Sequence, residues 1–181
     1  SMFFELNNVL SPTQFGFRKG LSTTMALHTG LNKAVTSLDH NFYSIGLFLD
    51  FKKLSTLHHD ILLYKLEQYG IRGIALSLIK SYLSDRSQKV NIDGVTSDLL
   101  PISFGVPQGS VLGPLLFLIY INDITDISSS GTGTDFVLFA DDTNVFFFGR
   151  NFSLVQLQIN KFMLSLKSYL KSNYLHVNLE K

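Results

Sequence analysis

The chain has 181 residues; 45% are hydrophobic and only 16% are charged, which is typical of a folded, core-rich protein. It contains no cysteine, and this excludes a disulfide framework and thiolate metal sites. The longest apolar stretch, Val111 to Ile121, is too short to cross a bilayer, and the amino terminus lacks the order of a secretion signal. We therefore expect an intracellular protein, nuclear or cytoplasmic, with no membrane partner.

The formal net charge is only +1, which argues against strong binding of nucleic acid, because phosphate neutralisation needs Lys and Arg. Basic residues nevertheless cluster locally. Arg18-Lys19, Lys52-Lys53 and the stretch from Arg86 to Lys89 could each form a basic face, whereas the lysines near the carboxy terminus are read equally well as solvated surface residues. The affinity of this chain alone for nucleic acid should be weak.

In the first half of the chain, helical and strand patterns alternate irregularly. Apolar residues recur at helical spacing from Thr23 to Leu38, and Ser22 can cap the start. The run from Tyr43 to Leu49 is almost continuously apolar, as expected of a central strand covered on both faces. Two more helical patterns follow, Asp60 to Tyr69 and Ile74 to Leu83.

The second half continues the mixture. Asp93-Gly94 is a dipeptide favoured by tight hairpin turns, and short β-prone segments flank it. The remaining patterns predict an apolar helix capped by Ser110 and running to about Ile124, a hairpin from Phe136 to Phe148, an amphipathic helix from Ser153 to Leu170, and a short strand from Leu175 on.

Strands and helices without strict βαβ alternation predict an α+β fold, in which helices back a small antiparallel sheet. The chain has no internal repeat, linker or low-complexity tract. We therefore expect residues 1–181 to form one domain.

Three carboxylates are the most informative residues. Asp141 and Asp142 interrupt the apolar hairpin, and Asp50 ends the apolar run that begins at Tyr43. Neighbouring buried carboxylates repel each other and are usually neutralised by cations. Three acids on adjacent strand ends could hold two Mg²⁺ ions roughly 3.5 to 4 Å apart, the arrangement of nucleotidyl transfer. Alone, each feature has a plain alternative, because acidic pairs are ordinary in β-turns and Asp50 could cap a helix.

The segment from Gly105 to Pro114 is dense in glycine and proline and precedes the apolar helix. It could be only a strained loop. Glycine next to Gln108 would also let a base or a sugar approach the backbone closely.

Four segments carry a family resemblance. The first is Ser11-Pro-Thr-Gln-Phe-Gly-Phe-Arg-Lys-Gly20, and the second is Phe48-Leu-Asp50-Phe-Lys-Lys with His59-Asp60-Ile-Leu-Leu downstream. The third is Gly105-Val-Pro-Gln-Gly-Ser-Val-Leu-Gly-Pro-Leu-Leu-Phe117, and the fourth is Phe139-Ala-Asp141-Asp142. In this combination the chain resembles the reverse transcriptases of non-LTR retrotransposons, the LINE-like elements. The resemblance extends from about Leu10 to the end of the chain.

The resemblance implies the palm of a right-hand polymerase that performs RNA-directed DNA synthesis. It implies a partial fingers segment over about residues 1–40, with the remaining fingers and the thumb supplied by the parent polypeptide. The partners would be an RNA template, a DNA primer and a deoxynucleoside triphosphate, and the cofactor Mg²⁺ or Mn²⁺. The implied residues are Asp50, Asp141 and Asp142 for catalysis and metal binding, and Arg18, Lys19, Phe51, Gln108 and Gly109 for nucleotide and template binding.

A second hypothesis is a catalytically impaired or inactive module, derived from a reverse transcriptase, that acts in binding or assembly. The segment Leu54 to Leu57 is one residue shorter than is usual in the family, and Leu21 replaces a common arginine. A shifted loop beside Asp50 would matter, because errors of about 1 Å in such sites cost on the order of a hundredfold in rate. Nucleotide cyclases, a remote third reading, share paired acids at a hairpin but give no reason for the Pro-Gln-Gly-Ser loop.

Overall fold

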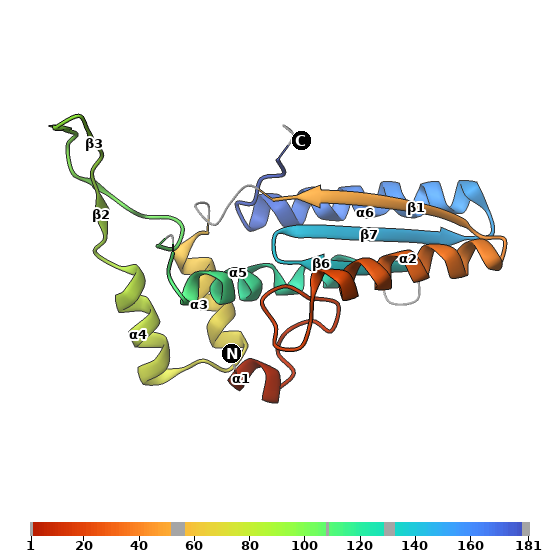
Figure 1. The fold of residues 1–181 in the computed structure, drawn as a ribbon, viewed down its shortest axis with the longest axis horizontal. Coiled ribbons are helices and arrows are strands. Elements are labelled where there is room, and N and C mark those ends of the chain that lie inside the picture. Colours follow the sequence, from red (N-terminus) through yellow and green to blue (C-terminus); the bar gives the residue numbers. More distant parts are fainter. Residues whose placement is uncertain (1, 52–56, 108, 129–132, 179–181) are drawn as a thin grey trace. The chain divides into compact units, whose positions relative to one another are not determined.

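The computed structural model describes residues 2–51, 57–107, 109–128 and 133–178 (Figure 1). The chain divides into two compact units, of which the first combines Ser1–Lys53 with Ile121–Lys181 and the second is Leu54–Tyr120. The assignment of residues 1–181 to a single palm domain with a partial fingers segment stays a prediction. Among the described residues, no helix has both the length and the apolar character needed to span a membrane.

The first unit is built on a three-stranded antiparallel sheet in the order β1-β7-β6. Strand β1 is Tyr43–Asp50, β6 is Thr134–Phe139 and β7 is Asp142–Gly149 (Figure 1). The prediction of a central strand at Tyr43 to Leu49 was wrong, because β7 pairs with both neighbours and β1 has only β7 beside it in the described sheet. Correspondingly, Phe48 on β1 is 70% exposed.

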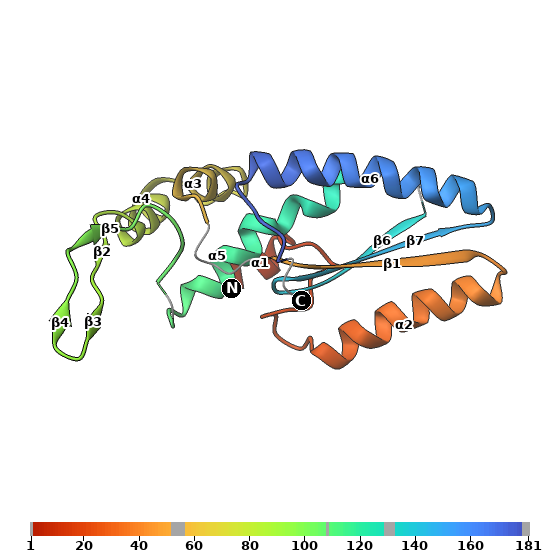
Figure 2. The same ribbon diagram turned by 90° about the horizontal axis from the view of Figure 1, so that it is seen from above.

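The two faces of the sheet are covered by different helices, α6 (Phe152–Ser172) on one and α2 (Thr23–Asp39) on the other (Figure 2). Alternation along the strands places every second side chain on the α6 face. That face forms the main core, which contains Leu49, Phe51, Ile124, Phe136, Leu138, Val145, Phe147, Val155, Phe162 and Leu166.

Helix α2 begins where the sequence predicts, with the Ser22 side chain accepting a hydrogen bond from the Met25 N–H. Its buried positions are small: Ala26, Gly30 and Ser37. A Cβ on Gly30 would lie 3.1 Å from the ring of Phe146, so a larger residue here would require that ring to shift by a few tenths of an ångström. The larger apolar residues of α2 stay exposed, among them Leu27, Leu31, Val35 and Leu38.

The predicted helix near the carboxy terminus is confirmed as α6, which begins one residue early because Asn151 caps it. The Asn151 side chain accepts hydrogen bonds from the N–H groups of Ser153 and Leu154. Of the strand expected from Leu175 on, the residues described up to 178 contain an isolated antiparallel bridge between Val177 and Phe51. The same unit contains the short helix α1 (Met2–Leu6) and the 3-10 helix η2 (Asn122–Ile127).

The second unit is mainly helical and carries a β-hairpin. Its helices are α3 (His59–Gln68), α4 (Gly73–Leu83) and most of α5 (Leu112–Ile121). The predicted turn at Asp93-Gly94 is confirmed, with φ values of 49° and 84°, which are typical of a type I′ turn. The turn joins β3 (Asn91–Ile92) to β4 (Val95–Thr96), and β2 (Ser87–Gln88) pairs with β5 (Leu100–Pro101).

Helix α5 ends earlier than predicted, at Ile121, and the chain continues as η2. Pro114 lies in the first turn of α5, where its missing N–H costs no helical hydrogen bond. The Ser110 hydroxyl accepts a hydrogen bond of 2.9 Å from the Gly113 N–H, which is the capping contact expected of this serine. In the same unit the buried Lys65 ammonium donates 2.6 Å to the carbonyl oxygen of Tyr120.

Candidate active site

The predicted hairpin is confirmed, and its two-residue turn is Ala140-Asp141, one residue earlier than the reversal expected at Asp141-Asp142. Ala140 has φ of 55°, in the left-handed region that non-glycine residues rarely adopt. Two-residue hairpins commonly need such a positive φ at their first central position. A non-glycine residue in this conformation costs roughly 1 kcal/mol or more, so other contacts must hold Ala140 there. The turn therefore places Asp141 at the tip of the hairpin through a strained residue.

Asp50 and Asp142 lie directly opposite each other in the β1·β7 ladder. Facing residues of an antiparallel pair share one face of the sheet, with Cβ atoms about 4.5 to 5.5 Å apart. Asp141 precedes Asp142 in the turn, so all three acids lie at one end of the sheet. Asp142 is exposed, and Asp50 and Asp141 are half-buried. Like charges facing each other are destabilising, and a cation would relieve the repulsion.

Asp50 is held by a residue from the end of the described chain. The Asn178 amide Nδ2 donates a hydrogen bond of 3.0 Å to Oδ2 of Asp50, and its backbone N–H donates one of 2.7 Å to the Asp50 carbonyl oxygen. The antiparallel bridge between Phe51 and Val177 aligns the two segments. Sequence reasoning missed Asn178, and its only signal was a position within the alternating run that starts at Leu175.

The three acids supply suitable donors for a divalent metal ion, but their side chains do not converge on one point. Carboxylate oxygens are the ligands that Mg²⁺ prefers. Within the described part of the chain, however, no three acidic or histidine side chains converge closely enough to hold a metal ion. The three acids therefore share one end of the sheet, and metal binding by them stays a prediction.

Arg18 and Lys19, predicted to bind nucleotide or template, differ in their surroundings. The Arg18 guanidinium forms a bidentate ion pair with Glu5, at 2.7 and 3.0 Å, and donates to the carbonyl oxygens of Ser11 and Gln14 at 2.9 and 3.2 Å. Its hydrogen bond and charge lower the pKa of the Glu5 carboxyl below its ordinary value. Through these contacts Arg18 joins helix α1 to the segment from Ser11 to Gln14. Lys19 is exposed.

Phe51, predicted to bind nucleotide or template, is only 1% exposed and belongs to the main core. Its part in binding stays a prediction. The α6 face of the sheet is apolar, so a phenylalanine directly after β1 is more stable inside it than in water. Phe51 therefore supports the site from within the core.

The glycine-rich loop belongs to the second unit, and its base is fixed by Leu57 and by His59, the first residue of α3. The Gly105 N–H donates 2.8 Å to the carbonyl oxygen of Leu57, and Nε2 of His59 donates 2.7 Å to the carbonyl oxygen of Gly105. Gly109 has φ of 75°, is exposed, and has no atom within 4 Å of an added Cβ. A ligand could approach its backbone closely. Gln108 and residues 52–56, which include most of the shortened segment, lie outside the described residues.

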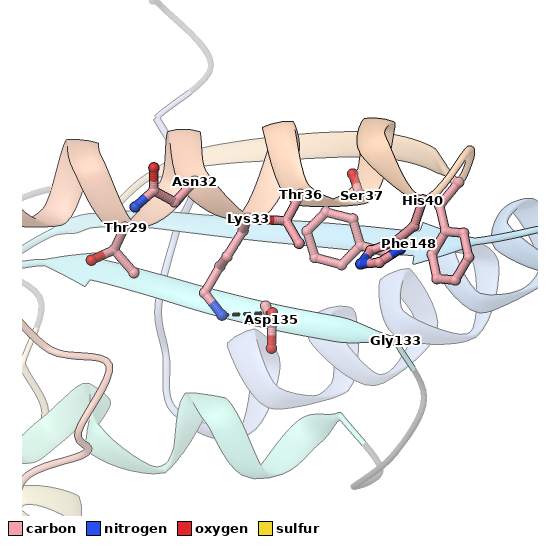
Figure 3. Close-up of a pocket in the computed structure, with 10 residues that line it drawn as sticks. Thr29, Asn32, Lys33, Thr36, Ser37, His40, Gly133, Asp135 and Phe148 are labelled. Carbon is pink, nitrogen blue, oxygen red and sulfur yellow. Dashed lines mark hydrogen bonds and ion pairs between the residues drawn. The ribbon is translucent and has the colours of Figure 1, made fainter.

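Two cavities lie between α2 and the sheet in the first unit. One, of about 500 Å³, is mainly apolar and has Asp142 and Asn144 among its lining residues. The other, of about 540 Å³, is lined by none of the three acids. In it the Lys33 ammonium approaches the Asp135 carboxylate to 2.6 Å (Figure 3). Only the first cavity opens beside the candidate active site.

The chain belongs to the reverse transcriptase family. The model of that family, described as reverse transcriptase (RNA-dependent DNA polymerase), matches residues 2–181. The origin in a non-LTR, LINE-like element, expected from the four segments, is confirmed by the relatives.

The chain is similar to two proteins of Drosophila melanogaster. It is 30% identical to the RNA-directed DNA polymerase from mobile element jockey, over 98% of the chain and 20% of that protein. It is 35% identical to the probable RNA-directed DNA polymerase from transposon X-element, over 78% of the chain and 16% of that protein. The chain thus spans about a fifth of the length of the curated relatives it matches.

Among solved structures, the chain is similar to telomerase from Candida tropicalis. The apo form truncated from its C-terminal domain gives a TM-score of 0.72 at 16% identity, over 99% of this chain and 38% of that one. The complex with the TWJ fragment of telomeric RNA gives 0.70 at 14% identity, over 99% and 32%. With the antiparallel sheet and its helices, this likeness confirms the predicted α+β palm fold.

Proposed function

We propose that this chain provides the palm of a LINE-like reverse transcriptase and that Asp50, Asp141 and Asp142 hold two divalent metal ions for nucleotidyl transfer. The observation that carries the proposal is the direct pairing of Asp50 with Asp142, with Asp141 in the adjoining turn. The substrates would be an RNA template, a DNA primer and a deoxynucleoside triphosphate. The rest of the parent polypeptide would supply the remaining fingers and the thumb.

The acids and their supports have distinct tasks in this proposal. Asp50, bonded by the Asn178 amide, would present one carboxylate in a set orientation, and Asp142 would present a second one that is exposed to solvent. When bound, Mg²⁺ or Mn²⁺ would align the primer 3′-hydroxyl with the triphosphate and stabilise the developing charge. The chain needs no protein nucleophile, and Nε2 of His59 is already engaged by the Gly105 carbonyl oxygen.

Binding of the nucleotide and template would use the glycine-rich loop and exposed cations. The open backbone around Gly109, together with Gln108, suits close approach of a base or a sugar. Exposed Lys19 can contribute a positive charge toward phosphate. With a formal net charge of +1, the chain alone would bind weakly, and most of the affinity would come from the parent protein.

The alternative function is that of a palm module that binds or assembles without catalysis. It is favoured by the side chains of the three acids, which do not converge as a metal-ligating group in the described residues. The burial of Phe51 and the short segment Leu54 to Leu57 point the same way.

The decisive experiment is primer extension on an RNA template with Mg²⁺, using the full-length parent protein. Asp141→Ala should abolish extension. Asp135→Asn is the matched control. It removes another acid of the same hairpin, and that acid pairs with Lys33. Extension that is unaffected by Asp141→Ala would refute the proposed chemistry.

A Mn²⁺ titration of thermal stability separates the two functions. A ligand that binds only the folded state raises its stability. A rise that disappears in Asp50→Ala would contradict the non-catalytic alternative, and the absence of any rise in the unmodified protein would support it.

A further inference from the structure

The hairpin that carries Asp141 and Asp142 is held by a segment from the beginning of the chain. The Leu138 N–H donates 2.9 Å to the carbonyl oxygen of Thr13, and the Phe15 N–H donates 2.8 Å to the carbonyl oxygen of Leu138. Gln14 and Leu138 form a parallel bridge. The segment therefore extends the sheet beyond β6, next to the turn.

Gln14 reaches the turn itself. Its side chain is buried, with the residue only 2% exposed, and Oε1 accepts hydrogen bonds from the N–H groups of Gly16, at 2.7 Å, and Ala140, at 3.1 Å. Ala140 is the residue with φ of 55°, and it is buried as well. A buried N–H without a partner destabilises the folded state, because it loses its hydrogen bond to water and gains none in the protein. The amide of Gln14 thus satisfies the N–H of the most strained residue in the hairpin.

Gly16 brings the two backbones into close contact. A Cβ at this position would lie 2.3 Å from the Ala140 nitrogen and 3.0 Å from its Cα. Real Cβ atoms do not come so near, so only glycine permits the observed packing. The turn residue is therefore enclosed on one side by Gly16 and bonded by Gln14.

The segment is itself anchored. The Arg18 guanidinium donates to the carbonyl oxygens of Ser11 and Gln14 and pairs with Glu5. Fixing both the backbone and the side chain of Gln14 reduces the entropy that its hydrogen bond to Ala140 would otherwise cost. Gln14 is a rigid support and not a surface side chain that happens to lie near the turn.

We propose that Gln14 is a positioning residue, which sets the conformation of the Ala140-Asp141 turn so that Asp141 and Asp142 are presented for metal binding. This inference rests on the proposed function. It assigns to the amide of Gln14 a role that acts through the backbone of Ala140 and requires no contact with metal or substrate.

The first test measures hydrogen exchange of the Ala140 amide. Gln14→Met keeps the length of the side chain but loses the strong acceptor, whereas Gln14→Glu keeps an oxygen at that place. Exchange at Ala140 should be at least about tenfold faster in Gln14→Met and should return toward the original rate in Gln14→Glu. Thr13→Val, which removes only the hydroxyl contact with Ser11 at 2.8 Å, is the control and should leave this amide unchanged.

The second test measures Mn²⁺ affinity of the same proteins by calorimetry. Gln14→Met should bind about tenfold more weakly, as is usual when a partner behind the metal ligands is removed, and Thr13→Val should bind normally. Unchanged Mn²⁺ affinity in folded Gln14→Met would overturn the inference while leaving the proposed function intact. A parent protein that binds no Mn²⁺ would instead refute the proposed function.

A measurement on the unmodified protein covers the case in which Gln14→Met does not fold. The Ala140 amide should exchange at least about a hundredfold more slowly than an unstructured amide, because it is buried and bonded to Gln14. Exchange at the unstructured rate would overturn the inference without any variant.

Discussion

The Asn178 side chain donates a hydrogen bond of 3.0 Å to Asp50, and its backbone N–H donates to the carbonyl oxygen of the same residue. Asp50 is thus bonded on one side to Asn178 and faces Asp142 on the other. The carboxylate that ends β1 is oriented by a residue from the far end of the described chain.

The first prediction follows from that contact. Asn178→Ala should weaken Mn²⁺ binding by about tenfold, because residues that orient a metal ligand usually matter to this extent. The loss in stability should be only about 1 kcal/mol, the value of one partly buried hydrogen bond. Calorimetric titration and chemical denaturation measure the two effects. Asn160→Ala, on the exposed face of α6, should leave Mn²⁺ binding unchanged and should not destabilise the protein, because alanine favours a helix more than asparagine does.

The second prediction concerns repulsion between Asp50 and Asp142. Without divalent metal, Asp142→Asn should stabilise the protein by about 0.5 kcal/mol, because it removes one of two like charges that face each other. With saturating Mg²⁺ the order should reverse, since only the unmodified protein gains stability from the ion. Thermal denaturation in EDTA and in Mg²⁺ tests both signs.

The control for that experiment is Asp135→Asn. It breaks the partly exposed ion pair with Lys33, which contributes about 1 kcal/mol. Its effect should be the same with and without Mg²⁺. A reversal of sign in this variant as well would mean that the metal acts elsewhere on the protein.

The third prediction concerns the pH dependence of the ion pair between Arg18 and Glu5. The Arg18 guanidinium lowers the pKa of Glu5 below its ordinary value of 4.5 in the folded state. The contribution of Glu5 to stability is therefore present above pH 4.5 and is lost as the pH falls through the lower folded-state pKa. Glu5→Gln should destabilise the protein at pH 7, and the difference should shrink at acid pH. Denaturation curves at a series of pH values measure it.

The fourth prediction concerns the packing of Gly16 against the hairpin. Gly16→Ala should destabilise the protein by about 1 to 3 kcal/mol, as overpacking does, and should weaken Mn²⁺ binding, because the added Cβ must push Ala140 away. Gly20→Ala is the matched control in the same segment. It strains a backbone with φ of 80° but meets no atom within 4 Å, so metal binding should be unchanged.

The sequence allowed the local elements to be predicted because their signals are local. Ser22 caps α2, Asp93-Gly94 forms its turn, and the pair Asp141-Asp142 lies where one strand reverses into the next. Each depends on the conformational preference of a few consecutive residues. The family resemblance then indicated the palm fold that the strand order and the likeness to solved structures confirm.

The order of the strands and the supports of the acids could not be predicted in this way. An almost wholly apolar run suggested that β1 is central, yet one of its faces leaves Phe48 exposed and β7 takes the middle position. Gln14 and Asn178 are single polar residues that act on Ala140 and Asp50, and each pair is brought together only by folding. Gln14 lies within the first of the four family segments, but neither that motif nor any periodicity indicates which residue it contacts.

The pairing of β1 with β7 also has a kinetic consequence, because all of the second unit lies between them in sequence. On the ribosome, β1 is synthesised well before β7, the strand with which it pairs. Until β7 emerges, the apolar residues of β1 lack their native contacts with that strand. Contacts between such distant segments close slowly, since the entropy of a long loop has to be overcome first. Residues 54–120 therefore influence how quickly Asp50 and Asp142 meet, even though neither acid belongs to that stretch.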